Sequence, residues 1–181
     1  MTTPGPEVRT DRLLLRRWRP TDLEPFAALN ADPEVMEYFP HTRTRAETKE
    51  LIGVFEDQFE RQGFGLWALE VSEHARFVGM VGLAVIAQGW VLESSVELGW
   101  RLARTEWGHG YATEAARAAV RFAFDELDLG EVVAMTSVDN LRSRRVMDRL
   151  GMVHDPSLDF DHPRFPAGHP HQRHVMYRLK R

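Results

Sequence analysis

The clearest pattern in this chain is a strand that leads through a glycine loop into a helix. Apolar positions alternate with polar or small ones over residues 96–103, which is the period of a β-strand. Beyond residue 110 the apolar side chains recur at the spacing of one helix face: Ala115, Ala118, Ala119, Phe122 and Leu127. The residues between the two elements, 107–115, read Trp-Gly-His-Gly-Tyr-Ala-Thr-Glu-Ala. Gly108 and Gly110 are therefore predicted to lie at a helix N-terminus.

The remaining pattern predicts an α+β chain. Strands are expected over residues 13–18, 64–71, 77–86, 132–138 and 175–179. Helices are expected after the capping box Thr21-x-x-Glu24, ending near Asn30; after Asp32-Pro33, as a short one; after the capping box Thr44-x-x-Glu47, ending at Gly63; and over residues 140–150. No internal repeat or linker interrupts this order, so we expect a single domain over residues 1–181.

The glycine loop is suited to binding an anion. The first backbone N–H groups of a helix lack intrahelical partners, and glycines without Cβ allow a pyrophosphate to approach the main chain. The known nucleotide fingerprints do not fit, however. No lysine follows Gly110 at the spacing of a P-loop, and Thr113 stands where a dinucleotide fingerprint has its third glycine.

Residues 107–115 instead resemble the acetyl-CoA loop of the GCN5-related N-acetyltransferases (GNAT), whose signature is Arg/Gln-x-x-Gly-x-Gly/Ala. The signature falls on Trp107, Gly110 and Ala112, with Trp107 departing from the usual Arg or Gln. The longer string is similar to the ribosomal-protein N-terminal acetyltransferases, the RimJ/RimL-type subgroup. Further stretches that resemble this subgroup are residues 10–16, 32–35, 78–83, 140–143 and 150–152, where Met152 replaces the usual aromatic residue.

The resemblance implies a fold and a way of binding acetyl-CoA. The family's sheet is mixed and mostly antiparallel, with six to seven strands splayed between its two central strands and about four flanking helices. The main chain of Leu102 should pair with the pantetheine arm, while Asn140 and Ser143 contact it from the other side. The pyrophosphate should lie on the loop formed by Trp107, Gly108, His109, Gly110, Tyr111, Ala112 and Thr113.

The implied reaction is direct attack of a primary amine on the acetyl thioester in a ternary complex. The acceptor is a protein or peptide N-terminal α-amino group, or else a small amine such as an amino acid, a polyamine or an antibiotic. A CoA-binding module without turnover is the alternative from another functional class. The resemblance leaves a homodimer open.

Two residues are candidates for catalysis. Many relatives use a tyrosine as the acid that protonates the thiolate, but its position here is Met147, which cannot donate; Ser143 is the candidate substitute. Asn140 and Ser143 can also be read as an ordinary helix cap. Glu97 is the candidate base on the strand before the loop, with a structural ion pair as its alternative reading and a solvent chain as an alternative route for the proton.

Composition narrows the functional class. A net charge of −4 over 181 residues argues against general nucleic-acid binding. The chain has no cysteine, and neither a signal-peptide core nor an apolar membrane span is evident, so we expect a cytoplasmic protein without a membrane partner. The run Arg16, Arg17 and Arg19 is interpreted as the solvated side of the first strand.

Residues 154–174 hold five of the eight histidines, at spacings that match no zinc pattern. We therefore expect no metal, although a metal site is the alternative. The segment from Pro156 to Pro170 is predicted to be a long loop beside the acceptor pocket, with Phe160, His162 and Phe165 on its wall, or else an ordinary surface loop. Tyr38 and His41 are placed near the same pocket, and Trp18, Trp67 and Trp100 are predicted core residues.

Overall fold

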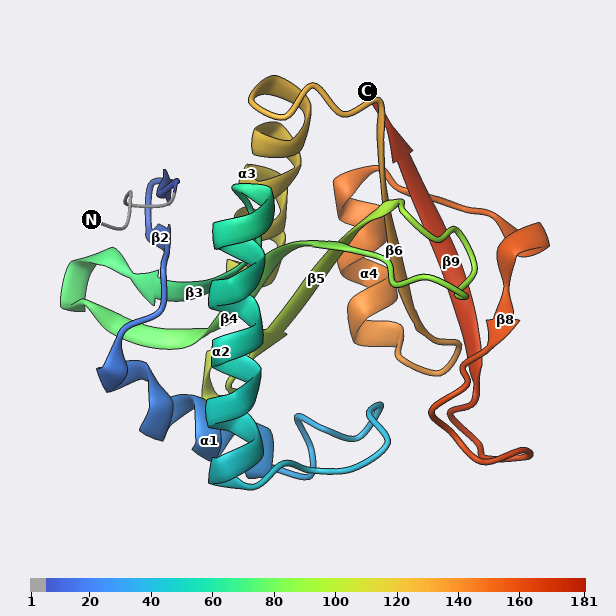
Figure 1. Ribbon diagram of the computed structural model, residues 1–181, viewed down its shortest axis with the longest axis horizontal. Coiled ribbons are helices and arrows are strands. Elements are labelled where there is room, and N and C mark those ends of the chain that lie inside the picture. The colour runs from blue at the N-terminus through green and yellow to red at the C-terminus, as the bar shows by residue number, and fades with distance from the viewer. Residues whose placement is uncertain (1–5) are drawn as a thin grey trace.

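The computed structural model describes residues 6–181 as one mixed sheet with helices on both faces (Figure 1). The strands are β1 (Val8–Arg9), β2 (Leu13–Arg16), β3 (Leu66–Val71), β4 (Arg76–Val85), β5 (Val96–Leu102), β6 (Glu131–Ser137), β7 (Val153–His154), β8 (Phe160–Asp161) and β9 (Arg173–Lys180). Their order is β1-β2-β3-β4-β5-β6-β9-β7, with β8 also paired to β9. Within residues 6–181, six strands have four residues or more, as expected, and the three two-residue strands bring the sheet to nine.

The splay expected at the centre of the sheet is present. All other strand pairs are antiparallel, whereas β5 and β6 are parallel and are paired only at Glu97 and Val133. Beyond this point the two strands separate, which leaves unpaired backbone on both sides of a gap. The α+β fold with a splayed mixed sheet is thus confirmed.

Among the residues that the structure describes, four helices cover the sheet: α1 (Leu23–Ala31), α2 (Arg45–Gln62), α3 (Tyr111–Asp125) and α4 (Leu141–Leu150). Alanines of α3 pack with Trp67 and Leu98 on one face, while α1 and α2 bury Phe26 and Phe55 against Ala68 and Met80 on the other. Because successive strand residues point to opposite faces, neighbours such as Trp67 and Ala68 enter different cores. None of the helices within residues 6–181 has both the length and the apolar character that crossing a membrane requires.

The local signals for α2 are confirmed. Thr44 Oγ1 accepts the Glu47 N–H at 3.2 Å, and the Glu47 carboxylate accepts the Thr44 N–H at 2.7 Å. Gly63 ends the helix in the left-handed conformation, with φ of 75°, where an L side chain is strained.

Nearer the N-terminus, the helix predicted to end near Asn30 is confirmed as α1, but its predicted cap at Thr21 and the short helix predicted after Asp32-Pro33 are wrong. A 3₁₀ turn over Pro20–Asp22 precedes α1, and it is the Asp22 carboxylate, not Thr21, that accepts a backbone N–H, from Arg19 at 2.8 Å. Residues 32–44 contain no helix: the Asp32 carboxylate accepts the Glu34 N–H, as a cap would, but the chain continues only as turns and bends. These residues instead form an irregular loop beside the sheet.

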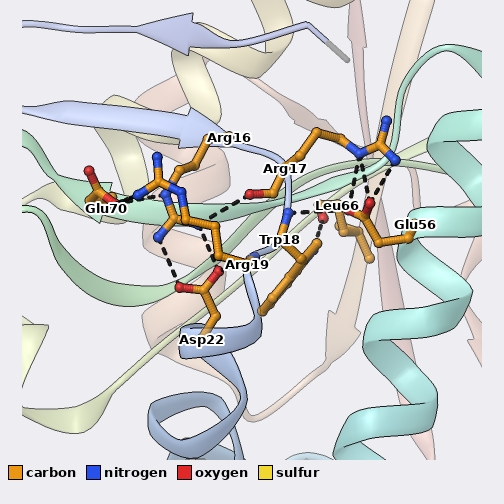
Figure 2. A network of polar contacts seen from close by, with 8 residues as sticks. All are labelled: Arg16, Arg17, Trp18, Arg19, Asp22, Glu56, Leu66 and Glu70. Carbon is orange, nitrogen blue, oxygen red and sulfur yellow. Dashed lines mark hydrogen bonds and ion pairs between the residues drawn. The ribbon is translucent and has the colours of Figure 1, made fainter. Parts of the chain in front are cut away.

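The interpretation of the arginine run as solvated is wrong for Arg16 (Figure 2). Arg17 is only partly exposed, whereas Arg19 is exposed as expected. Arg16 is only 3% exposed and donates two hydrogen bonds to Asp22, at 2.7 and 2.9 Å, and one to Glu70, at 2.7 Å. Arg17 binds Glu56 of α2. Arg16 can be desolvated because carboxylates from two other elements, β3 and the turn before α1, neutralise its charge.

Candidate active site

A cavity of about 990 Å³ opens where β5 and β6 separate. Its walls are β5, the glycine loop, the first turns of α4, the irregular loop over residues 34–43 and the segment 162–165. Segments from across the chain therefore meet at the gap in the sheet. Trp18 and Trp67 are buried core residues as predicted, whereas Trp100 is only partly buried and also lines the cavity.

The glycine loop presents a helix N-terminus to this cavity. Gly108 and Gly110 adopt φ of 82° and 81°, and no side chain forms a capping hydrogen bond at Gly110, the N-cap of α3. A Cβ at Gly108 would meet no atom within 4 Å, and at Gly110 only the Arg12 guanidinium at 3.6 Å. The amides at the start of α3 thus face open space, which suits a pyrophosphate.

Other residues of the loop fix its position. The Trp107 indole N–H donates to the Leu102 carbonyl at 3.1 Å, and the Arg142 guanidinium lies 4.3 Å from the Trp107 ring. The tryptophan that departs from the family signature thus ties the loop to β5 and α4. Ala112 and Thr113 line the cavity, whereas the His109 ring stacks on Tyr111 and is not part of the wall.

Glu114 is a structural residue of this motif that sequence reasoning missed. Its carboxylate accepts hydrogen bonds from the Thr10 hydroxyl at 2.6 Å and the Arg12 guanidinium at 2.7 Å. These bonds attach the first turn of α3 to the connection between β1 and β2. The sequence does contain a signal for the contact of Glu114 with Thr10 and Arg12. It is the occurrence of Thr113-Glu114 in the loop motif together with Thr10-x-Arg12 near the N-terminus.

The backbone of Leu102 faces the gap between β5 and β6. Leu102 is opposite Gly79 of β4, and the next residue, Ala103, donates its N–H to the Val78 carbonyl at 3.0 Å. Hydrogen-bonded and non-hydrogen-bonded pairs alternate along an antiparallel ladder, so the N–H and C=O of Leu102 point away from β4. The C=O accepts the Trp107 indole N–H on this side, and a carbonyl oxygen can accept a second hydrogen bond. The residues on this side of the gap therefore fit an extended ligand chain such as pantetheine.

Asn140 and Ser143 form a small hydrogen-bonded group at the start of α4. The Asn140 side-chain oxygen accepts the Ser143 N–H at 3.2 Å, so the predicted helix cap is present. The Asn140 amide also donates to the Thr136 hydroxyl at 2.9 Å and to the Ser143 hydroxyl at 3.1 Å. Because the Ser143 oxygen accepts from Asn140, its own proton is directed elsewhere, and both residues line the cavity. Met147 follows one turn later and is 1% exposed.

Glu97 lies in the cavity wall at the point where β5 and β6 pair. Burial raises the pKa of Glu97 to about 7, against a smaller opposing effect of the Arg164 charge. Within residues 6–181 its carboxylate forms no ion pair or hydrogen bond that would support the structural reading. A carboxylate with a pKa near neutrality can accept a proton under physiological conditions.

The histidine-rich segment forms part of the wall and part of an aromatic cluster. His162 and Phe165 line the cavity as expected, whereas Phe160 packs near Ile86, Val133 and Met176 instead. Burial lowers the pKa of His162 to about 4, so this side chain is neutral at pH 7. In the part of the chain that the structure describes, no three His, Asp or Glu side chains are grouped as metal ligands would be.

Comparison with known proteins agrees with this geometry. The model of the acetyltransferase (GNAT) domain matches residues 12–153. The uncharacterized protein YkkB of Bacillus subtilis is 31% identical over 150 residues, which cover 82% of this chain and 86% of YkkB. A crystal structure of an acetyltransferase from Agrobacterium tumefaciens has a TM-score of 0.81 at 25% identity, covering 100% of this chain and 98% of that one.

The fold is also that of RimL, the ribosomal L7/L12 α-N-protein acetyltransferase, solved with coenzyme A. Its TM-score is 0.78 at 14% identity, and the match covers 97% of this chain and 98% of RimL. The splayed sheet and the glycine loop before α3 are the features that the sequence motif predicted. With the family model spanning most of its length, this chain belongs to the GNAT family and is an acetyl-CoA-dependent N-acetyltransferase.

Proposed function

We propose that this protein acetylates a primary amine by direct attack in a ternary complex, and that the acceptor is the N-terminal α-amino group of a protein or peptide. The observation that carries the proposal is the meeting, in one cavity, of the open N-terminus of α3 with Glu97 and Ser143. The structural likeness to RimL, which acts on the α-amino group of a ribosomal protein, supports this acceptor class.

Acetyl-CoA supplies the thioester whose carbonyl carbon the amine attacks. The loop from Trp107 to Thr113 binds the pyrophosphate, and the Leu102 backbone aligns the arm. Glu97 accepts the proton of the attacking nitrogen, directly or through water. Ser143 donates a proton to the departing sulfur, and Asn140 holds the serine. A C–N bond forms as the C–S bond breaks, giving an N-acetyl product and coenzyme A.

A small amine is the second candidate acceptor. The observation that favours it is a buried arginine, Arg101, on the wall of the cavity. A cation at that depth suits a compact acceptor with an anionic group better than it suits a polyamine.

The test is coenzyme A release from acetyl-CoA with a panel of peptides and small amines. We expect release with free N-termini or small primary amines, and mass spectrometry should locate the acetyl group on that nitrogen. Peptides with blocked N-termini and no lysine serve as controls. If no primary amine in a broad panel supports release above the hydrolysis rate, the proposal is wrong.

A further inference from the structure

Several arginines on the cavity wall have no carboxylate partner within residues 6–181, and two of these, Arg43 and Arg101, are not exposed. Arg101 of β5 is 9% exposed, and Arg43, at the end of the irregular loop, is half-buried. The Nε atom of each is buried without a hydrogen-bond partner. Buried cations are normally paired, because an unpaired charge in the interior is costly. An anionic ligand would offset that cost.

The pair is held in place by Asn30 of α1, which is fully buried. The Asn30 side-chain oxygen accepts a hydrogen bond from the Arg101 guanidinium at 2.6 Å, and its backbone carbonyl accepts the Arg43 N–H at 2.8 Å. The Asn30 amide in turn donates to Thr48 at 3.2 Å. Phe39 covers the Arg101 guanidinium at 4.1 Å. A neutral amide thus orients the cation without neutralising it.

The arginine pair and the candidate base lie along one face of β5. Residues 97, 99 and 101 point to the same side of the strand, and four residues span about 13 Å between the Cα atoms of Glu97 and Arg101. Gly99 lies between them, where a Cβ would meet only Leu66, at 3.7 Å. This leaves space for an acceptor that extends along the strand.

We propose that Arg43 and Arg101 form a carboxylate-binding subsite and that the acceptor carries a carboxylate as well as its primary amine. The amine lies at Glu97 and the carboxylate is bound by the two guanidinium groups, whose planar donors match its oxygens. This inference rests on the proposed acetyl transfer. The carboxylate belongs either to a free ω-amino acid or to an acidic residue near a peptide N-terminus, and the same cations would repel a polyamine.

The test compares acceptors that differ only in the carboxylate. One arm pairs ω-amino acids of four to six carbons with alkylamines of equal length, and the other pairs peptides that carry Glu or Gln at the second position. For the wild-type protein we expect kcat/KM, from coenzyme A release, to be at least tenfold higher for the acidic member of one arm. The arm that shows the preference identifies the source of the carboxylate.

Variants assign the preference to the two arginines. Arg101→Gln and Arg43→Gln should each reduce the ratio of kcat/KM between acidic and neutral acceptors at least tenfold, and Arg101→Lys should retain part of it. Arg45→Gln is the matched control, because Arg45 is exposed two residues from Arg43 and pairs with Glu24 outside the cavity. It should keep the wild-type ratio. Because Arg101 is buried, Arg43→Gln provides an independent variant if Arg101→Gln fails to fold.

The outcomes separate this inference from the proposed function. Equal kcat/KM for both members of every pair, or a ratio unchanged in a folded Arg43→Gln, would overturn the subsite while acetyl transfer stands. No coenzyme A release with any amine, acidic or neutral, would instead overturn the transfer reaction and the subsite with it.

Discussion

Glu97 shows how one residue's surroundings set its chemistry. Its folded-state pKa of about 7 means that it is protonated, and unable to accept a proton, at lower pH. We expect kcat/KM to rise with pH through about 7 and to level off above, apart from the titration of the amine itself. In Glu97→Gln the rise of kcat/KM near pH 7 should be absent, and kcat/KM should be roughly 10²-fold lower.

The measurement is the pH profile of coenzyme A release for both proteins. Glu50→Gln, an exposed change on α2, should leave the profile unaltered. If Glu97→Gln keeps the limb near pH 7, the proton leaves by another route, such as a chain of solvent molecules.

Variants of Ser143 and Asn140 distinguish a catalytic role from a helix-capping role. Ser143→Ala removes the hydroxyl but keeps the backbone N–H that Asn140 caps. We expect kcat to fall about 10²-fold while acetyl-CoA affinity and the melting temperature change little. Asn140→Ala should instead destabilise the protein by about 1 kcal/mol through loss of the cap. A wild-type kcat in Ser143→Ala would leave the serine with only its structural role.

At the scale of single residues, the sequence indicates a functional role only for residues that lie at a recognisable spacing from a motif. Glu97 and Ser143 stand at fixed distances from a recognisable loop, and the structure brings both to the cavity. Arg101 carried no such signal. Its partner Asn30 is 71 residues away, so only the tertiary fold shows that this arginine is buried without a carboxylate.

At the scale of elements, the junction of loop and helix is the feature most open to test. A side chain at Gly110 would occupy the space in front of the α3 N-terminus and strain a residue with φ of 81°. Gly110→Val should weaken acetyl-CoA binding at least tenfold in calorimetry. Gly63→Val imposes similar strain, at φ of 75°, but at the end of α2 outside the cavity, and should leave affinity intact. If Gly110→Val binds acetyl-CoA as tightly as Gly63→Val does, the assignment of the loop to pyrophosphate binding is wrong.

The ion pairs of Arg16 join three elements, β2, β3 and the turn before α1. Arg16→Met leaves the carboxylates of Asp22 and Glu70 buried without this cation. We expect a loss of about 3–5 kcal/mol in the free energy of unfolding, measured in urea. Arg9→Met removes an exposed pair with Glu7 and should cost less than about 1 kcal/mol. A comparable loss in the two variants would show that burial does not decide the strength of these pairs.

The ends of a helix were predictable where they depend on residues close by in the sequence. The cap at Thr44 and the stop at Gly63 depend on residues within one turn, and both are confirmed. The predicted cap at Thr21 failed because Thr21 lies inside the 3₁₀ turn over Pro20–Asp22, so that α1 begins only at Leu23. The strands β1, β7 and β8 have two residues each, too few to show a period in the sequence.

For the molecule as a whole, the arrangement of strands could not be read from hydrophobic patterning. The parallel contact of β5 with β6 joins strands separated by all of α3, and β9 enters between β6 and β7 from the C-terminus. No local signal specifies that order; the splayed sheet was expected only because residues 107–115 resemble a family motif.

The same topology predicts how the whole protein responds to acetyl-CoA. The cavity is bounded by β5 and α3 on one side of the gap and by β6 and α4 on the other, so a ligand that spans it binds only the folded arrangement. At a hundredfold excess over Kd the stabilisation is about 2.7 kcal/mol. For a chain of this size, that should raise the melting temperature by roughly 5–10 °C. The rise should be much smaller in Gly110→Val and preserved in Ser143→Ala. A wild-type melting temperature unchanged by millimolar acetyl-CoA would mean that the loop does not bind it with useful affinity.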